Sequence, residues 1–259
     1  MRIGLLSGIH GNLPALEACW SELRSAGADV VISLGNLVQY GPFPSEVLEF
    51  VRENSIDSVQ GNCDRAVARS RDHDGSSYQN VHWESLGMEA LRWTSSQLGD
   101  DDRRFLRRLP DELRYEVGGT RVLCVHGLPG RITEEIHGQL PGEIYDLLLR
   151  RNDCHVLLTG HGNRILLAQR STGWIVSPGS VGGGTLPQAA SMAVLSLEER
   201  HRRSVSWFRV EYDFQRYERA YTEANLPEIF LRCIKLGRDP EGRWHATEPV
   251  WRERWAKRS

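Results

Sequence analysis

One stretch decides the fold: Leu5-Leu6-Ser7-Gly8-Ile9-His10-Gly11-Asn12. It continues the apolar run of residues 3–6, which predicts a buried strand, and it ends where Asn12 and Pro14 predict the N-cap and first turn of a helix. Side chains between a strand and the following helix project into the crevice beyond the sheet, where open α/β folds commonly bind ligands. His10, which lies between the predicted strand and helix, is therefore a candidate for a functional site.

The composition is that of an ordinary globular chain. Its 259 residues suffice for one large α/β domain or two small ones, and its formal net charge of −2 gives no overall field that would attract nucleic acid or an anionic membrane. We expect no signal peptide, and no apolar run approaches the length of a membrane span. Its five cysteines are scattered without a CxxC pair, which favours reduced thiols. We expect a cytoplasmic protein.

The first half alternates between strand and helix patterns. Strands are expected at residues 3–6, 29–33 and 56–60, with helices at 13–27 and 45–53. This β-α-β succession predicts parallel strands at the centre of a sheet. Residues 71–80 are polar and rich in turn formers, and they predict a loop. Two further helices, around 81–97 and 100–109, indicate a helical cap over residues 71–110. This cap could equally cover the sheet or act as a substrate-selecting lid.

The second half is dominated by strands. The expected elements are a hairpin of residues 112–117 and 121–125, a helix at 143–150, and strands at 156–159, 165–169, 174–177, 191–197 and 204–210. A chain that begins β-α-β and ends in antiparallel strands predicts an α/β fold in which two mixed sheets pack face to face between helices.

We expect residues 1–212 to form one domain, followed by a C-terminal helical extension, 213–259, packed on it. Helices are expected at 214–224 and 227–236. Residues 238–259 combine three tryptophans with basic residues, a mixture that could bind nucleic acid. A tail strapped to its own domain is the favoured interpretation, because the upstream sequence carries no matching basic stripe.

Polar residues with a nearby glycine follow the predicted strands. They are His10, Asn36, Asn62, His126, His161 and Asn163. Imidazole nitrogens and amide oxygens are suitable ligands for Mn²⁺, Fe²⁺, Zn²⁺ or Ni²⁺, and the glycines allow the backbone to approach a metal or a phosphate closely. The sequence therefore predicts a metal or phosphate site at the ends of the strands.

The motifs resemble those of the calcineurin-like metallophosphoesterases, in particular the compact bacterial and archaeal phosphodiesterases. The matching stretches, in chain order, are Gly8-Ile9-His10-Gly11-Asn12, Gly35-Asn36-Leu37-Val38, Gly61-Asn62-Cys63-Asp64, Val125-His126-Gly127, Gly160-His161-Gly162-Asn163 and Pro178-Gly179-Ser180-Val181-Gly182. Their order and spacing follow the family pattern. The resemblance implies a four-layer α/β/β/α sandwich with the active site along one edge of the sheets.

The resemblance also implies which metal ligands are missing. The first metal of the family would fall on Gly8, His10, Asn36 and Asn163, of which only His10 is a strong ligand, so the other three positions are degenerate. The second metal would fall on Asn36, Asn62, His126 and His161, where only the bridging aspartate is lost. Two metals need anionic ligands between them, and the bridging carboxylate is the main one. We therefore expect no dinuclear centre, but one weakly bound divalent ion (Mn, Fe, Zn or Ni).

Three residues are candidates for catalytic roles. With its metal site lost, His10 could contact phosphate or shuttle a proton. Cys63 occupies a position where many relatives have a general-acid histidine, although it could equally be a buried inert thiol. Asp64 is expected to orient the loop or a ligand histidine rather than to act as a base.

Two functions remain open from the sequence. The first is a metal-dependent hydrolase, a phosphatase or phosphodiesterase with a reduced site, acting on a phosphate-ester small molecule or nucleotide. The second is a catalytically inactive member of the fold that binds a phosphorylated ligand or a protein, similar to the retromer scaffold subunit. We expect no membrane partner and disfavour nucleic acid; a homo-oligomer is left open.

Overall fold

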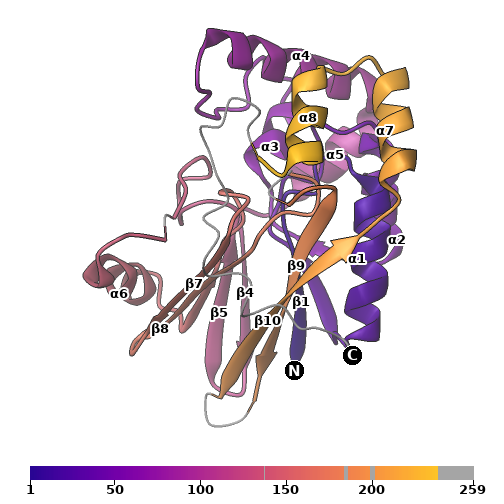
Figure 1. Cartoon of the computed structure of the whole chain (residues 1–259). Coiled ribbons are helices and arrows are strands. Elements are labelled where there is room, and N and C mark those ends of the chain that lie inside the picture. Colours follow the sequence, from indigo (N-terminus) through magenta and orange to yellow (C-terminus); the bar gives the residue numbers. More distant parts are fainter. Residues whose placement is uncertain (137, 184–185, 199–201, 239–259) are drawn as a thin grey trace.

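Two five-stranded sheets pack face to face between helices in the computed structural model, which describes residues 1–136, 138–183, 186–198 and 202–238 (Figure 1). The sheet nearer the N-terminus has the strand order β10-β9-β1-β2-β3. Its strands are β1 (Arg2–Leu6), β2 (Val30–Ser33), β3 (Asp57–Ser58), β9 (Ala189–Leu197) and β10 (Arg203–Glu211). β1, β2 and β3 run parallel, whereas β9 is antiparallel to both β1 and β10.

The second sheet has the order β4-β5-β6-β8-β7. Its strands are β4 (Glu112–Val117), β5 (Thr120–Val125), β6 (Val156–Leu158), β7 (Ile165–Arg170) and β8 (Gly173–Pro178). β5, β6 and β8 are parallel, and β4 and β7 form antiparallel edges. Both sheets are thus mixed, with three parallel strands each, so the carboxyl ends of these strands place their loops at one end of the molecule.

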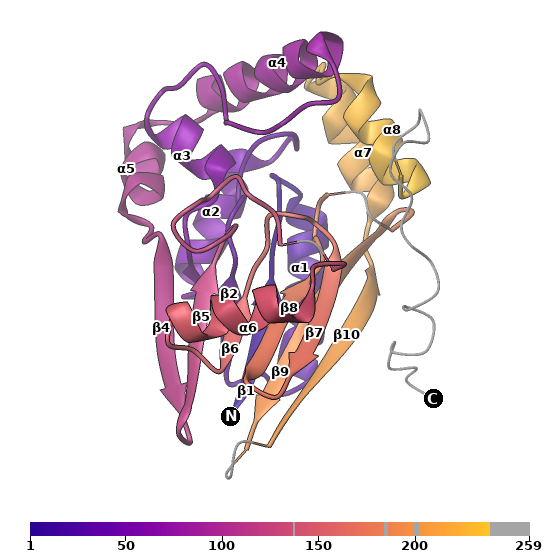
Figure 2. The ribbon, with the colours of Figure 1, turned by 90° about the vertical axis from the view of Figure 1, so that its left-hand side faces the viewer.

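Helices form the outer layers and also cover one end of the sheets. They are α1 (Leu13–Ser25), α2 (Pro44–Glu53), α3 (Asn62–Ala68), α4 (Val81–Gln97), α5 (Asp100–Arg108), α6 (Gly142–Arg151), α7 (Phe214–Glu223) and α8 (Glu228–Leu236). α6 lies outside the second sheet, and α1 and α2 lie outside the first (Figure 1). α4 and α8 lie beyond the carboxyl ends of the strands, as Figure 2 also shows. The predicted four-layer α/β/β/α sandwich is confirmed.

The core between the sheets makes this scaffold rigid. Ile3, Leu5 and Ile32 of the first sheet and Cys124 and Leu158 of the second are fully buried in one cluster. Alternate residues of each strand point the other way, into the helix layers. The polar loops that follow β1, β2, β5 and β6 are therefore anchored by strands whose apolar side chains fix their register.

The structure differs from the sequence predictions around residues 56–70. The strand expected at 56–60 shrinks to Asp57–Ser58, because the Gln60 amide donates to Pro110 O (2.8 Å) and the chain leaves the sheet. Helix α3 was not predicted. It begins at Asn62, after an extended Gly61, and the Asp64 carboxylate caps its first turn.

The domain boundary and the packing of the C-terminal tail stay predictions. The boundary between a domain of residues 1–212 and an extension is not tested, although α7 and α8 pack on the preceding structure through a cluster that joins Ala90 to Phe214 and Leu231. Residues 239–259, with the tryptophan-rich tail, lie outside the described part. None of the described helices combines the length and apolar character needed to cross a membrane.

Candidate active site

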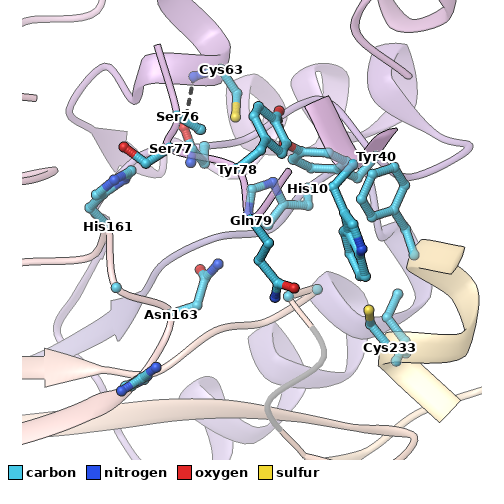
Figure 3. A pocket seen from close by; sticks show the side chains of 18 residues that line it. His10, Tyr40, Cys63, Ser76, Ser77, Tyr78, Gln79, His161, Asn163 and Cys233 are labelled. Atoms are coloured by element: carbon cyan, nitrogen blue, oxygen red, sulfur yellow. Dashed lines mark hydrogen bonds between the residues drawn. The ribbon is translucent and has the colours of Figure 1, made fainter. Parts of the chain in front are cut away.

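The sequence-predicted site residues come together at one end of the sheets. The loops after β1 and β2 supply His10 and Asn36, α3 begins with Asn62, and the loops after β5 and β6 supply His126 and His161. Asn163 follows His161 in the same loop. His161 and Asn163 lie on one side of a cavity, with Tyr40 and Cys233 on the other (Figure 3).

Three of these residues have a left-handed backbone. The φ angles are +52° at His10, +58° at Asn36 and +51° at Asn163. Histidine and asparagine tolerate this region better than most residues, but it still costs free energy. Such strain tends to collect where a site must be pre-organised, so the backbone supports a functional role for these loops.

His126 has a fixed tautomer. Its Nδ1 lies 2.6 Å from the Leu34 carbonyl oxygen, which can only accept, so Nδ1 carries the proton. Burial, with smaller contributions from neighbouring positive groups, lowers the pKa of His126 to about 3. The ring is therefore neutral at pH 7, and Nε2 presents a lone pair to the site.

A second lone pair faces His126. Asn62 donates from Nδ2 to Asp74 O (3.2 Å) and Ser76 Oγ (3.0 Å), which fixes the orientation of its amide. Its Oδ1 lies 3.1 Å from His126 Nε2. Neither atom has a proton to offer the other, so this contact lacks a donor. His161 Nδ1 lies 3.2 Å from the same Nε2, so three potential ligand atoms converge.

Asn36 uses both ends of its amide inside the protein. Its Nδ2 donates to Asn62 Oδ1 (3.1 Å), and its Oδ1 accepts from the Cys63 amide (3.0 Å). A carboxylate at this position would be an anionic ligand, whereas the amide orients Asn62 and the start of α3. Asn36 therefore contributes to the shape of the site more than to its charge.

Asp64 holds the two central loops together. Its carboxylate accepts from the amides of Asn36 (2.8 Å), Leu37 (2.8 Å), Val38 (3.2 Å) and Gly61 (2.9 Å). Burial raises the pKa of Asp64 to about 6, against the effect of these donors. Backbone amides from both loops thus engage both carboxylate oxygens.

Cys63 lies at the wall of the cavity but is almost fully buried. Burial raises the pKa of its thiol well above the usual value, and the charges of Asp74 and Asp64 add to this effect. The thiol therefore stays protonated at neutral pH and is a very weak acid. These properties match the inert alternative considered for Cys63.

Gly8 leaves no room for a side chain. A Cβ on Gly8 would lie 2.4 Å from Asn163 Oδ1 and 2.7 Å from Ser180 Oγ, and the φ of Gly8 is +53°. Ser180 is held in place, since its Oγ donates to Gly8 O (2.9 Å) and accepts from the Gly183 amide (2.7 Å). The local backbone is thus built around glycine at this position.

Sequence reasoning missed Asp74. Its carboxylate is buried and accepts from Gln39 Nε2 (2.9 Å), Tyr78 OH (2.9 Å) and Tyr40 OH (3.2 Å). Its negative charge raises the pKa of His10 and His161, opposing the effect of burial. The polar stretch 71–80 carries two aspartates on either side of a histidine, and no pattern distinguishes the one that turns inward.

His10 faces the cavity with an unsatisfied nitrogen. Within the described residues, its buried Nδ1 has no hydrogen-bond partner. Burial lowers the pKa of His10 to about 4, so the ring is neutral at pH 7. Such a nitrogen is suited to contact a ligand that enters the cavity.

The cavity has a volume of about 360 Å³. Its polar side includes His10, His161, Asn163 and Arg164. No group of three or more His, Cys, Asp or Glu side chains that could hold a metal ion occurs in the described part of the chain. These four residue types leave out asparagine, the residue type of two ligand candidates, Asn36 and Asn62.

Residues 1–200 match the model of the calcineurin-like phosphoesterase superfamily domain. The chain belongs to this superfamily. A curated relative is MJ0912 from Methanocaldococcus jannaschii, an uncharacterized protein that is 26% identical to this chain. The alignment covers 91% of this chain and 98% of MJ0912.

Two solved structures are similar to this chain over most of its length. A metallophosphoesterase from Sphaerobacter thermophilus is 30% identical, with a TM-score of 0.71 over 92% of this chain and 99% of its own. The hypothetical protein PH1004 from Pyrococcus horikoshii is 27% identical, with a TM-score of 0.76 over 92% and 98%. The superfamily resemblance inferred from the motifs is confirmed.

Proposed function

We propose that this superfamily member is a phosphoesterase that works with one divalent metal ion, and that it hydrolyses a phosphomonoester or phosphodiester. One observation carries the proposal: His126 Nε2 and Asn62 Oδ1, both without a proton, face each other at 3.1 Å. A cation between them would convert an unfavourable contact into two favourable ones.

The residues present fit a single ion. Two neighbouring ligand atoms about 2.1 Å from one ion are about 3 Å apart. His126 Nε2 lies 3.1 Å from Asn62 Oδ1 and 3.2 Å from His161 Nδ1, which matches this spacing. The Leu34 carbonyl holds His126 in the ligating tautomer, the usual arrangement for a metal-binding histidine. All three ligands are neutral, so binding is expected to be weak. When bound, the ion would supply Lewis acidity toward phosphate and water.

The remaining residues bind and orient the substrate. His10 Nδ1, buried and unpartnered among the described residues, contacts the phosphate or exchanges a proton with it. Arg164 brings an exposed guanidinium to the cavity, and this group suits the phosphate charge. Asp64 keeps the loops of Asn36 and Asn62 in register, and Cys63 takes no part in proton transfer.

Hydrolysis of p-nitrophenyl phosphate and bis-p-nitrophenyl phosphate with Mn²⁺, Ni²⁺ or Zn²⁺ tests the proposal. We expect turnover that requires metal and disappears in His126→Ala and His161→Ala. His82→Ala is the matched control, because His82 is exposed on α4. Turnover that persists in both site variants would contradict the proposal.

The second candidate is an inactive scaffold that binds a phosphorylated ligand or a protein. The observation that favours it is the engagement of Asn36, at the position of the bridging aspartate, in purely structural hydrogen bonds. A preparation with a normal melting curve and no turnover with any of the three metals would support the scaffold and refute the hydrolase.

A further inference from the structure

The wall of the cavity opposite the polar residues is aromatic. Tyr40, Tyr78, Trp83 and Phe230 line it, and they come from four different segments: the loop after β2, the loop before α4, α4 itself and α8. A planar group of a ligand could pack against these rings while its phosphate occupies the polar side of the cavity.

The rings form a continuous edge-to-face series that begins at the polar end. His10 and Tyr40 have centroids 5.3 Å apart, Tyr40 and Phe230 4.8 Å, and Phe230 and Trp83 5.9 Å, with interplanar angles between 61° and 71°. Mutual edge-to-face packing holds each ring in place. A pre-organised wall loses little side-chain entropy when a ligand binds.

Helix α8 supplies much of this wall. Phe230, Cys233 and Ile234 all lie on α8 and line the cavity, and Figure 3 shows Cys233 and Tyr40 opposite Asn163 and His161. The superfamily model ends at residue 200, so α8 lies outside it. The phosphate end of the cavity is therefore built by superfamily motifs, whereas the far end is built by an element beyond them.

We propose that this wall is a subsite for a planar aromatic ring carried by the phosphate ester, a nucleobase or a simple aryl group. This inference rests on the proposed function for the phosphate end. The cavity volume of about 360 Å³ lies within the roughly 300–1,000 Å³ typical of small-molecule sites. Ser76 and Ser77 lie beside Tyr78 and offer hydroxyls to the polar edge of a base.

Phosphonates test the subsite without turnover, because a P–C bond replaces the ester. Calorimetric titration of the full chain with Mn²⁺ compares methylphosphonate, phenylphosphonate and a 5′-phosphonate analogue of AMP. We expect phenylphosphonate to bind about 5- to 150-fold more tightly than methylphosphonate, the range expected for stacking on aromatic side chains. A preference below twofold for both ring-bearing ligands overturns the subsite.

The variant Phe230→Leu keeps an apolar side chain on α8 and removes the ring. We expect it to lose most of the preference for the ring while methylphosphonate affinity stays unchanged. Phe105→Leu is the matched control, since Phe105 lies on α5 and does not line the cavity. Equal weakening of all three ligands by Phe230→Leu would show that α8 only packs on the domain, and would overturn the proposal.

The remaining outcomes separate the sources and the two proposals. Tighter binding of the AMP analogue than of phenylphosphonate supports a nucleobase; equal or weaker binding supports a simple aryl group. Ring preference without metal-dependent hydrolysis leaves the subsite standing and refutes the hydrolase. Metal-dependent hydrolysis without ring preference supports the hydrolase and refutes the subsite.

Discussion

Acid should destabilise this protein in a pH range set by its buried histidines. Burial lowers the pKa of His126 to about 3 and that of His10 to about 4, from an ordinary value of 6.5. Below pH 6.5 the unfolded chain takes up both protons, whereas the folded chain does not until the pH approaches 4. Unfolded chains thus bind more protons, and the free energy of unfolding falls as the pH falls.

The magnitude follows from the two shifts. Each proton contributes about 1.4 kcal/mol per pH unit, so two give about 2.7 kcal/mol per unit and about 5 kcal/mol between pH 6.5 and 4.5. That loss is a large part of the 5–15 kcal/mol by which domains are usually stable. The lowered pKa of His161 has the same sign and adds to the effect. The raised pKa of Asp64, about 6, has the opposite sign, because below pH 6 the folded chain binds this proton and the unfolded chain does not. Asp64 therefore offsets about 2 kcal/mol of the loss between pH 6 and 4.5, which leaves about 3 kcal/mol.

Urea unfolding in metal-free buffer at several pH values between 7.5 and 4.5 measures this dependence. The variant His126→Asn should lower the slope by about 1.4 kcal/mol per unit, whereas His82→Asn, on the exposed face of α4, should leave it unchanged. A flat profile for the wild type, or an unaltered slope in His126→Asn, would refute the reasoning.

Three further substitutions test the loops. Asp64→Asn replaces an acceptor oxygen with a donor facing backbone amides, and should cost about 2–4 kcal/mol in chemical unfolding; a loss below 0.5 kcal/mol would contradict its positioning role. Gly8→Asp should lower the melting temperature, since the left-handed backbone alone costs about 1–2 kcal/mol and Ser180 blocks the side chain; an unchanged melting temperature would show that the loop adapts. Cys63→Ala should retain hydrolysis within about threefold, or about 0.7 kcal/mol of activation free energy, because a thiol that stays protonated transfers no proton in the reaction; a tenfold loss would reveal an acid role.

The sequence predicted the scaffold because apolar runs and strand-end glycines are local signals. The runs at residues 3–6 and 156–159 fill one core, and the polar residues that follow them meet at one end of the sheets. A mixed pair of sheets followed from the switch from β-α-β units to hairpins. The start of α3 at Asn62 escaped prediction, because its cap comes from Asp64 in a turn that reads equally as a loop.

The details of the site could not be read from residue types. The tautomer of His126 depends on the Leu34 carbonyl, 92 residues away along the chain. The inward turn of Asp74 depends on hydroxyls of Tyr40 and Tyr78. Likewise, Phe230 reaches the cavity only because α8 packs beside α4, a long-range arrangement that the pattern of either helix leaves open.

The stoichiometry of metal binding tests the central claim most directly. Equilibrium dialysis against Mn²⁺ should give one ion per wild-type chain and none per His126→Ala chain, since Nε2 of His126 lies 3.1 Å from Asn62 Oδ1 and 3.2 Å from His161 Nδ1. Two ions per wild-type chain, no ion at all, or one ion retained by His126→Ala would contradict a single-metal site at His126, Asn62 and His161.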